Sequence, residues 1–306
     1  MKITVLAGGL GGSRFACALA ETIDPAGLTV VGNVGDDVEV LGQHVSPDLD
    51  TILYTLAGLF DEERGWGRGG ETWHALATAG ELGAETWFQL GDRDLGLHLV
   101  RTEALRAGVP LSVVTLRIAR ALGVEAALLP ATDDRLRTWV ETPAGAFPFQ
   151  DWFVRRQHRD EVDGVHFEGA EEAGPAPGVL EALGEADLIA IAPSNPFVSI
   201  GPILAVAAIR AALEHRRAPV IAVSPLIGGR SVRGPADRML ARLAGGTGPA
   251  QVTDCYKGLI DALVIDEADA GVPASVRTIV ARTLMRDADS RRRLAEAVLA
   301  TTAALS

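Results

Sequence analysis

Cysteine and positive charge are both scarce in this sequence. Only two cysteines, Cys17 and Cys255, occur among 306 residues, and they form neither a disulfide framework nor a metal-binding spacing. Both stand among apolar residues, so we expect buried thiols. Lys and Arg number 28 against 40 Asp and Glu, which gives a net charge of −12. This balance argues against a general nucleic-acid binder, because such a protein needs a basic stripe.

Long apolar runs and the common catalytic signatures are also missing. No apolar run reaches the length of a membrane span, and the N-terminal MKITVLAGG enters a glycine loop without the pattern of a secretory signal. We therefore expect a cytoplasmic protein without a membrane partner. The six histidines form neither an HExxH motif nor a triad pattern, so none is assigned a chemical role.

Hydrophobic residues are plentiful, at 48%, which is enough for one large α/β domain or a domain with a smaller insertion. The apolar runs 2–7 and 28–34 predict buried strands, and the segment 11–23 between them predicts a helix. This strand–loop–helix–strand start is typical of a Rossmann-like, doubly wound α/β fold with a mostly parallel sheet.

The middle of the chain interrupts that alternation. Four helical stretches follow one another within 48–123, with Asp48, Asp92 or Asp94, and Ser112 as candidate N-caps. We predict a small helical insertion domain at 48–123 and a Rossmann-like nucleotide-binding domain formed by 1–47 and 124–306.

Later segments return to strands and helices. Two extended runs around Pro143–Gly145 predict a hairpin. Strands are predicted at 186–195, 218–227 and, finally, 261–266; helices are predicted at 200–217 and 235–245 and through the last thirty-odd residues.

The loop AGGLGGSR follows the first predicted strand. Its glycines let the backbone approach a ligand, and the next helix offers free N–H groups to an anion. The loop matches neither GxGxxG nor the Walker pattern, so phosphate binding by Gly9, Gly11 and Gly12 stands beside a tight structural turn as the alternative. Arg14 is either a phosphate contact or a solvated helix residue.

Two later strand ends carry further candidates for nucleotide binding. Ser194 and Asn195 offer polar side chains, and Ser199 is a candidate cap for the helix that follows; ordinary capping is the alternative reading. In SPLIGGRSVRGPAD, Gly228, Gly229 and Arg230 are candidates for phosphate binding, with Arg233 close behind, and a solvated loop is the alternative.

Acidic residues crowd the second strand end, in GNVGDD, and the start of the insertion, in SPDLDT. Asp36, Asp37 and Asp50 are candidate Mg²⁺ ligands, because hard divalent cations prefer carboxylate oxygen and often bridge to substrate phosphates. Asp36 and Asp50 are also candidate catalytic groups, because a carboxylate can take the proton of an attacking hydroxyl. The sequence leaves these two roles open. Asp48 is interpreted as a helix cap.

The motifs GGLGGSR, GNVGDD, SPDLDT, RGWG, ETWFQLGDRDLG, APSNPFVSIGPIL and SPLIGGRSVRGPAD occur in an order that resembles the 2-phospho-L-lactate transferase family of coenzyme F420 biosynthesis. The resemblance covers about residues 1–267. It implies a Rossmann-like domain with a small helical domain, usually as a homodimer.

The resemblance also implies a reaction. A guanosine-diphosphate-linked donor gives its phosphoenolpyruvyl or 2-phospholactyl group to the ribityl hydroxyl of the deazaflavin Fo, with release of GMP and a requirement for Mg²⁺. Asp50 matches a residue at the reacting hydroxyl, and Asp36 matches a metal ligand. The glycine loop, Ser194, Asn195 and the 228–235 loop would hold the guanosine diphosphate portion.

Two other functions remain open at this point. One is a nucleotide-binding regulatory protein of the same fold without turnover of a deazaflavin. The other is a nucleotide-sugar or dinucleotide-dependent enzyme on a Rossmann scaffold.

Overall fold

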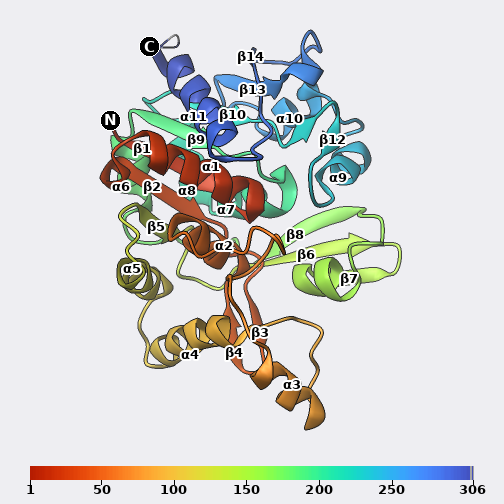
Figure 1. The fold of residues 1–306 in the computed structure, drawn as a ribbon. Helices are drawn as coiled ribbons and strands as arrows, with labels where there is room; N and C mark the ends of the chain where they lie inside the picture. The colour runs from red at the N-terminus through yellow and green to blue at the C-terminus, as the bar shows by residue number, and fades with distance from the viewer. Residues whose placement is uncertain (304, 306) are drawn as a thin grey trace.

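A seven-stranded parallel sheet forms the centre of the protein (Figure 1). The computed structural model describes residues 1–303 and 305. The strands run in the order β14-β13-β10-β9-β1-β2-β5. Their bounds are β1 Ile3–Ala7, β2 Leu28–Gly32, β5 Ala127–Pro130, β9 Leu188–Ile191, β10 Val220–Val223, β13 Ala262–Asp266 and β14 Arg277–Ala281.

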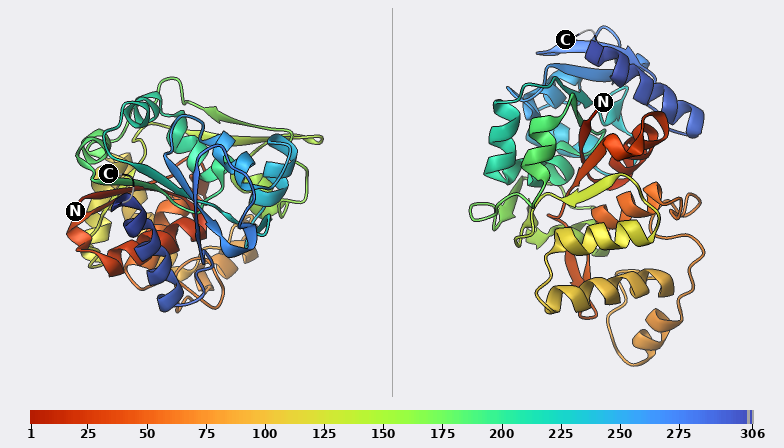
Figure 2. Two further views of the ribbon diagram at one scale, coloured as in Figure 1. Left: turned by 90° about the horizontal axis from the view of Figure 1, so that it is seen from above. Right: turned by 90° about the vertical axis from the view of Figure 1, so that its left-hand side faces the viewer.

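Helices cover both faces of this sheet, as a doubly wound fold requires (Figure 2). On one face α1 (Gly9–Thr22) packs against α11 (Ala288–Ala303), and on the other α6 (Val179–Glu185) packs against α8 (Ala207–Glu214). Every residue of β1 is buried, which explains why all but Thr4 are apolar. The predicted fold class is confirmed.

The segment 48–123 contains the four expected helices, α2 (Pro47–Leu56), α3 (His74–Glu81), α4 (Asp92–Arg106) and α5 (Leu111–Ala121). Of these, α2 packs on α1 and therefore belongs to the body of the sheet domain. A hairpin of β3 (Val38–Val40) and β4 (Gln43–Val45), which the sequence did not predict, contacts α4 through β4. In Figure 1, α3, α4 and this hairpin lie away from the central sheet.

A second extension is an antiparallel sheet in the order β7-β6-β8 (Figure 1). The predicted hairpin is confirmed as β6 (Arg137–Thr142) and β7 (Gly145–Pro148), and β8 (Gly164–Glu168) pairs with the other edge of β6. A π-helical turn, η2 (Asp151–Arg155), follows β7, and the ring of Trp152 anchors it in a small apolar core.

Two expectations about the C-terminal half are wrong. The last thirty-odd residues are not all helical, because β14 extends the sheet beyond β13; as an edge strand it is only partly buried and lacks a long apolar run. The single helix expected over 200–217 is instead a π-helical turn, η3 (Pro196–Ile200), followed by α7 (Gly201–Ala205) and α8. Val206 adopts an extended conformation between α7 and α8, which is why the axis bends.

The remaining elements are short. They are η1 Pro25–Gly27, β11 Leu226–Ile227, β12 Arg230–Ser231, α9 Ala236–Leu243, α10 Pro249–Cys255 and η4 Glu267–Asp269. Among the described residues, no single helix is both long and apolar enough to cross a membrane.

Candidate functional site

A cavity of about 770 Å³ opens at the carboxyl ends of β1, β2, β9 and β10. Ligands of doubly wound sheets bind at this edge, beside the point where the strand order reverses. Three regions line it: the loops that follow the parallel strands, the segment 45–98, and the segment 149–158 behind β7.

The glycine loop lies at the base of this cavity. Gly9 adopts a left-handed conformation with φ of 65°, and Gly9 and Gly11 line the cavity. A Cβ atom on Gly11 would overlap the carbonyl oxygen of Pro193, and one on Gly12 would lie 2.7 Å from the Ser194 hydroxyl. Both glycines are therefore required by the close approach of the 193–194 turn, and Gly12 lies beneath the cavity lining.

Two polar side chains of the predicted nucleotide site already form hydrogen bonds within the protein. The Ser194 hydroxyl donates to the Gly8 carbonyl at 2.7 Å, and the Asn195 side-chain oxygen accepts the Phe197 N–H at 2.9 Å. Both residues line the cavity. Ser199 also lines it but does not cap α7, whose N-cap is Ile200.

The 228–235 loop divides into two parts. The N–H groups of Gly228 and Gly229 donate to the carboxylate of Asp269 at 2.9 and 3.1 Å, and Arg230 is exposed; none of the three lines the cavity. Arg233 does line it, and its guanidinium donates to the Gly65 carbonyl at 3.1 Å. Arg233 is thus the charged residue of this loop that lines the cavity.

Arg14 also lines the cavity, at the end of the glycine loop. Its guanidinium donates to Glu62 at 2.5 Å and to the Met285 carbonyl at 3.4 Å. The side chain is therefore held by protein partners and is only partly available to an anion.

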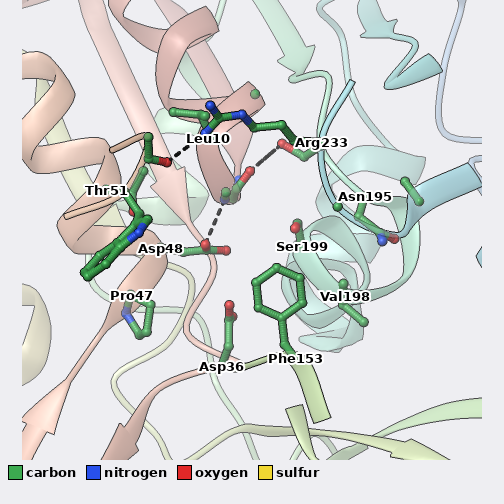
Figure 3. Close-up of a pocket in the computed structure, with 18 of the residues that line it drawn as sticks. Leu10, Asp36, Pro47, Asp48, Thr51, Phe153, Asn195, Val198, Ser199 and Arg233 are labelled. Carbon is green, nitrogen blue, oxygen red and sulfur yellow. Dashed lines mark hydrogen bonds between the residues drawn. The ribbon is translucent and has the colours of Figure 1, made fainter. Parts of the chain in front are cut away.

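Asp36 and Asp48 are two buried carboxylates that both line the cavity (Figure 3). The side-chain nitrogen of Asn33 donates to Asp36 and to Asp48, the latter at 2.9 Å. The other oxygen of Asp48 accepts the Gly9 N–H at 2.8 Å. The interpretation of Asp48 as an N-cap is wrong, because Ser46 is the N-cap of α2 and Asp48 turns toward the glycine loop.

Both carboxyl groups of this pair have raised pKa values. Burial raises the pKa of Asp36 well above its usual range, and the charges of Asp48 and Asp37 raise it further. Burial also raises the pKa of Asp48 to about 6, against the opposing effect of its hydrogen bonds to Asn33 and Gly9. Negative charge is thus concentrated here without a basic side chain to balance it.

Asp50, unlike Asp36 and Asp48, is paired with a basic side chain. Both of its oxygens accept hydrogen bonds from the buried guanidinium of Arg101, one of them at 2.9 Å. Asp37, in turn, accepts hydrogen bonds from His44 and Ser46, both at 2.9 Å, and does not line the cavity. The predicted trio Asp36, Asp37 and Asp50 therefore does not converge on one point. Across residues 1–303 and 305, no group of three or more His, Cys, Asp or Glu side chains is arranged to hold a metal ion.

A further polar cluster on α4 was missed by the sequence reasoning. Asp94 accepts a hydrogen bond from the Tyr54 hydroxyl at 2.5 Å and lies 3.3 Å from the His98 ring. Burial favours a higher pKa for Asp94, but the adjacent His98, the hydrogen bond from Tyr54 and the Arg101 charge lower it overall. Asp94, His98 and Arg101 follow at helical spacing on one face, a signal that could have grouped them.

Fold and cavity together define a Rossmann-like α/β protein with an acidic ligand site at its topological switch point. The family model of the 2-phospho-L-lactate transferase CofD matches residues 3–302. The chain belongs to this family, as the resemblance implied.

Relatives and solved structures agree with that assignment. The chain is 44% identical over 312 residues to a phosphoenolpyruvate transferase of Streptomyces coelicolor, covering 98% of this chain and 97% of the relative. It is 42% identical over 294 residues to the phosphoenolpyruvate transferase of Mycobacterium tuberculosis, covering 88% and 89%. A crystal structure of a UPF0052 family protein from Bacillus halodurans shares the fold, with a TM-score of 0.64 at 17% identity over 98% of this chain and all of that one.

Proposed function

We propose that this protein transfers a phosphoenolpyruvyl group from a guanosine-diphosphate-linked donor to the ribityl hydroxyl of the deazaflavin Fo, releasing GMP, in coenzyme F420 biosynthesis. The observation that carries the proposal is the open carboxylate pair Asp36 and Asp48 beside the glycine loop, in a cavity large enough for two small-molecule substrates. The names of the relatives favour phosphoenolpyruvate over 2-phospholactate as the three-carbon unit.

Mg²⁺ fits the Asp36–Asp48 pair. The two carboxylates are buried, share one amide and have raised pKa values, so a divalent cation would relieve their repulsion. When bound, Mg²⁺ would neutralise charge on the donor diphosphate. Asp50 is less suited to bind the metal ion than Asp36 and Asp48, because Arg101 already balances its charge.

The donor diphosphate would lie along the start of α1. The first N–H groups of a helix have no partner within it and attract anions, and Leu10 and Gly11 line the cavity at this point. Arg233 would supply a charged hydrogen-bond donor from the opposite loop.

The hydroxyl oxygen of Fo would attack the phosphorus that bears the three-carbon acid. The new P–O bond replaces the phosphoanhydride bond to the guanosine phosphate, and GMP leaves. The hydroxyl proton would pass to a carboxylate of the cavity wall that does not hold Mg²⁺, and Asp50 lies at that wall. Asp50 would orient the hydroxyl, because Arg101 fixes its carboxylate at the cavity wall.

The direct test incubates the protein with Fo, the phosphoenolpyruvyl donor and Mg²⁺ and measures the deazaflavin phosphodiester and GMP in equal amounts. Parallel reactions with the 2-phospholactyl donor decide the three-carbon unit. Tight binding of GDP without product from either donor would overturn the proposal and favour a nucleotide-binding regulator.

A further inference from the structure

The RGWG motif lies in a loop between α2 and α3, residues 58–70, that has no part in the reaction proposed above. We call this segment the lid loop. Gly65, Trp66 and Gly67, at its tip, line the cavity. Its two ends, Gly58 and Gly70, are glycines with left-handed φ values of 67° and 68°. Glycine tolerates large changes of φ and ψ, so the segment between these two positions can move as a unit.

Contacts within the lid loop make it compact. The guanidinium of Arg64 donates to the Asp61 carboxylate at 2.5 Å and to the Arg68 carbonyl at 3.0 Å. The same group lies 4.6 Å from the centroid of the Trp66 ring and 5.1 Å from that of Trp73, at the start of α3. The loop is therefore held together from within and on its α3 side, and it keeps its shape when contacts on the opposite side change.

On that opposite side, two arginines hold the lid loop. Arg14 of α1 donates to the Glu62 carboxylate at 2.5 Å, and Arg233 donates to the Gly65 carbonyl at 3.1 Å. A Cβ atom on residue 65 would lie 1.9 Å from Nη1 of Arg233, so this contact requires glycine. Within residues 1–303 and 305, the cavity lining contains no other arginine and no lysine.

The lid loop thus occupies the cationic side chains that a bound diphosphate would use. Glu62 gives Arg14 a negatively charged partner, and the Gly65 carbonyl gives Arg233 a neutral one. Phosphate oxygens are charged and accept paired hydrogen bonds from a guanidinium, so they are stronger partners than a carbonyl. A diphosphate that binds both arginines therefore competes with the loop.

The Arg14–Glu62 pair is suited to exchange. Nε of Arg14 is buried and has no acceptor among the described residues, so the present pairing leaves one donor unsatisfied. The Glu62 side chain is 54% exposed, and a salt bridge of this kind contributes little free energy. Arg291 of α11 lies 3.8 Å from Glu62 and remains beside it when Arg14 turns to another anion.

We infer that the lid loop is autoinhibitory: in the empty protein Glu62 and the Gly65 carbonyl occupy Arg14 and Arg233, and the diphosphate of the donor releases the loop by binding both arginines. This inference rests on the proposed function for the identity of the donor. The fraction of protein with the loop released then sets the apparent affinity for the diphosphate.

Titration calorimetry with GDP tests the competition. Glu62→Gln should bind GDP about twofold to fivefold more tightly, because the loop no longer offers Arg14 a charged partner. Glu63→Gln is the matched control, since it removes the same charge one residue away, at an exposed position that does not line the cavity. Its effect should stay below about 1.5-fold.

Thermal unfolding checks that both variants fold. Unchanged or weaker GDP binding in Glu62→Gln, or an equal gain in Glu63→Gln, would overturn the inference.

Quenching of tryptophan fluorescence by acrylamide follows the position of the loop. Trp66 is 43% exposed, and its release should increase the quenching when GDP binds. In Glu62→Gln the quenching should already be higher before GDP is added. Trp66→Phe should remove the response to GDP, which assigns the signal to the lid loop. A decrease of quenching with GDP would mean that the loop closes over the nucleotide, and would overturn the inference.

Product assays separate the lid loop from the reaction. Product formation by a protein whose GDP affinity does not respond to Glu62→Gln would overturn the inference and leave the proposed function standing. Release of the loop by GDP without product from either donor would support the inference and contradict the transfer reaction.

Discussion

Two acidic regions line the same cavity, and only one of them has basic side chains beside its carboxylates. On the α4 side, Asp50 is paired with Arg101, and Asp94 is bonded to Tyr54 and lies beside His98. On the β2 side, Asp36 and Asp48 share only the neutral amide of Asn33. In the first region the negative charge is balanced by protein side chains. In the second region a bound cation would have to balance it. The difference separates acids whose charge is balanced within the protein from acids whose charge is not.

The largest expected effect comes from breaking the balanced region. Arg101→Met leaves Asp50 buried without its partner and should lower the free energy of unfolding by about 3–5 kcal/mol, measured by urea denaturation. The double variant Asp50→Asn with Arg101→Met should recover much of that loss, because neither charge is then buried alone. The exposed pair Arg210–Glu214 is the control, and Arg210→Ala should cost about 0.5 kcal/mol or less. Equal losses in the single and double variants would contradict the account of Asp50.

Asp36→Asn tests the open region. Turnover should fall about a hundredfold or more, because a carboxylate proposed to hold Mg²⁺ is lost. The melting temperature should not fall, since burial and neighbouring acids already disfavour the ionised form of Asp36. Steady-state kinetics and thermal unfolding measure the two effects, with Glu39→Gln as an exposed acidic control. A large fall in stability would place Asp36 with the structural acids.

Arg233→Ala should raise the KM for the donor about tenfold, because one charged hydrogen bond to the diphosphate is removed. Arg230→Ala in the same loop should change it less than about twofold, since Arg230 does not line the cavity. Similar effects of both variants on the KM would mean that the loop changes its position when the donor binds.

The smallest expected effect concerns pH and Mg²⁺. A carboxyl group whose pKa is higher in the folded protein than in the unfolded chain stabilises the fold as pH falls through the folded value. The metal-free protein should therefore gain stability from Asp48 as pH falls from about 7 through about 6. Mg²⁺ competes with these protons, so it should raise the melting temperature by a few degrees at pH 7.5 and by less at pH 5.

Asp48→Asn serves as the control in the thermal unfolding experiment, and it should flatten both dependences. If Mg²⁺ raised the melting temperature equally at the two pH values, or if the variant kept the same pH dependence, Mg²⁺ would not bind at the carboxylate pair.

The start of the fold was predictable because its signals are local. The run that became β1, the glycine loop and the helix α1 lie within 22 residues, and each obeys its own rule of burial or periodicity. The edge strand β14 and the break at Val206 were not predictable in this way. The first depends on pairing with β13, and the second on how α7 and α8 pack.

The acids show the same limit at the site. Asp36, Asp48 and Asp50 were all visible in the sequence, but their partners were not. Arg101 lies 51 residues from Asp50, and the glycine N–H that binds Asp48 lies 39 residues away from it. Capping rules consider only the helix that follows a residue. They therefore predicted Asp48 as the N-cap of α2 and did not predict its place in the site. The homodimer implied by the resemblance stays a prediction.

Asn33 makes the charge balance of this site depend on a single amide. Its side-chain nitrogen donates to Asp36, to Asp48 and to the Val198 carbonyl at 3.2 Å, so one group joins β2, α2 and the η3 turn. Deamidation to aspartate would exchange that donor for a third negative oxygen between two others, with almost no change in shape. The fold would be kept, but repulsion would push Asp36 and Asp48 apart. Mass spectrometry and a loss of activity would detect this change before any unfolding.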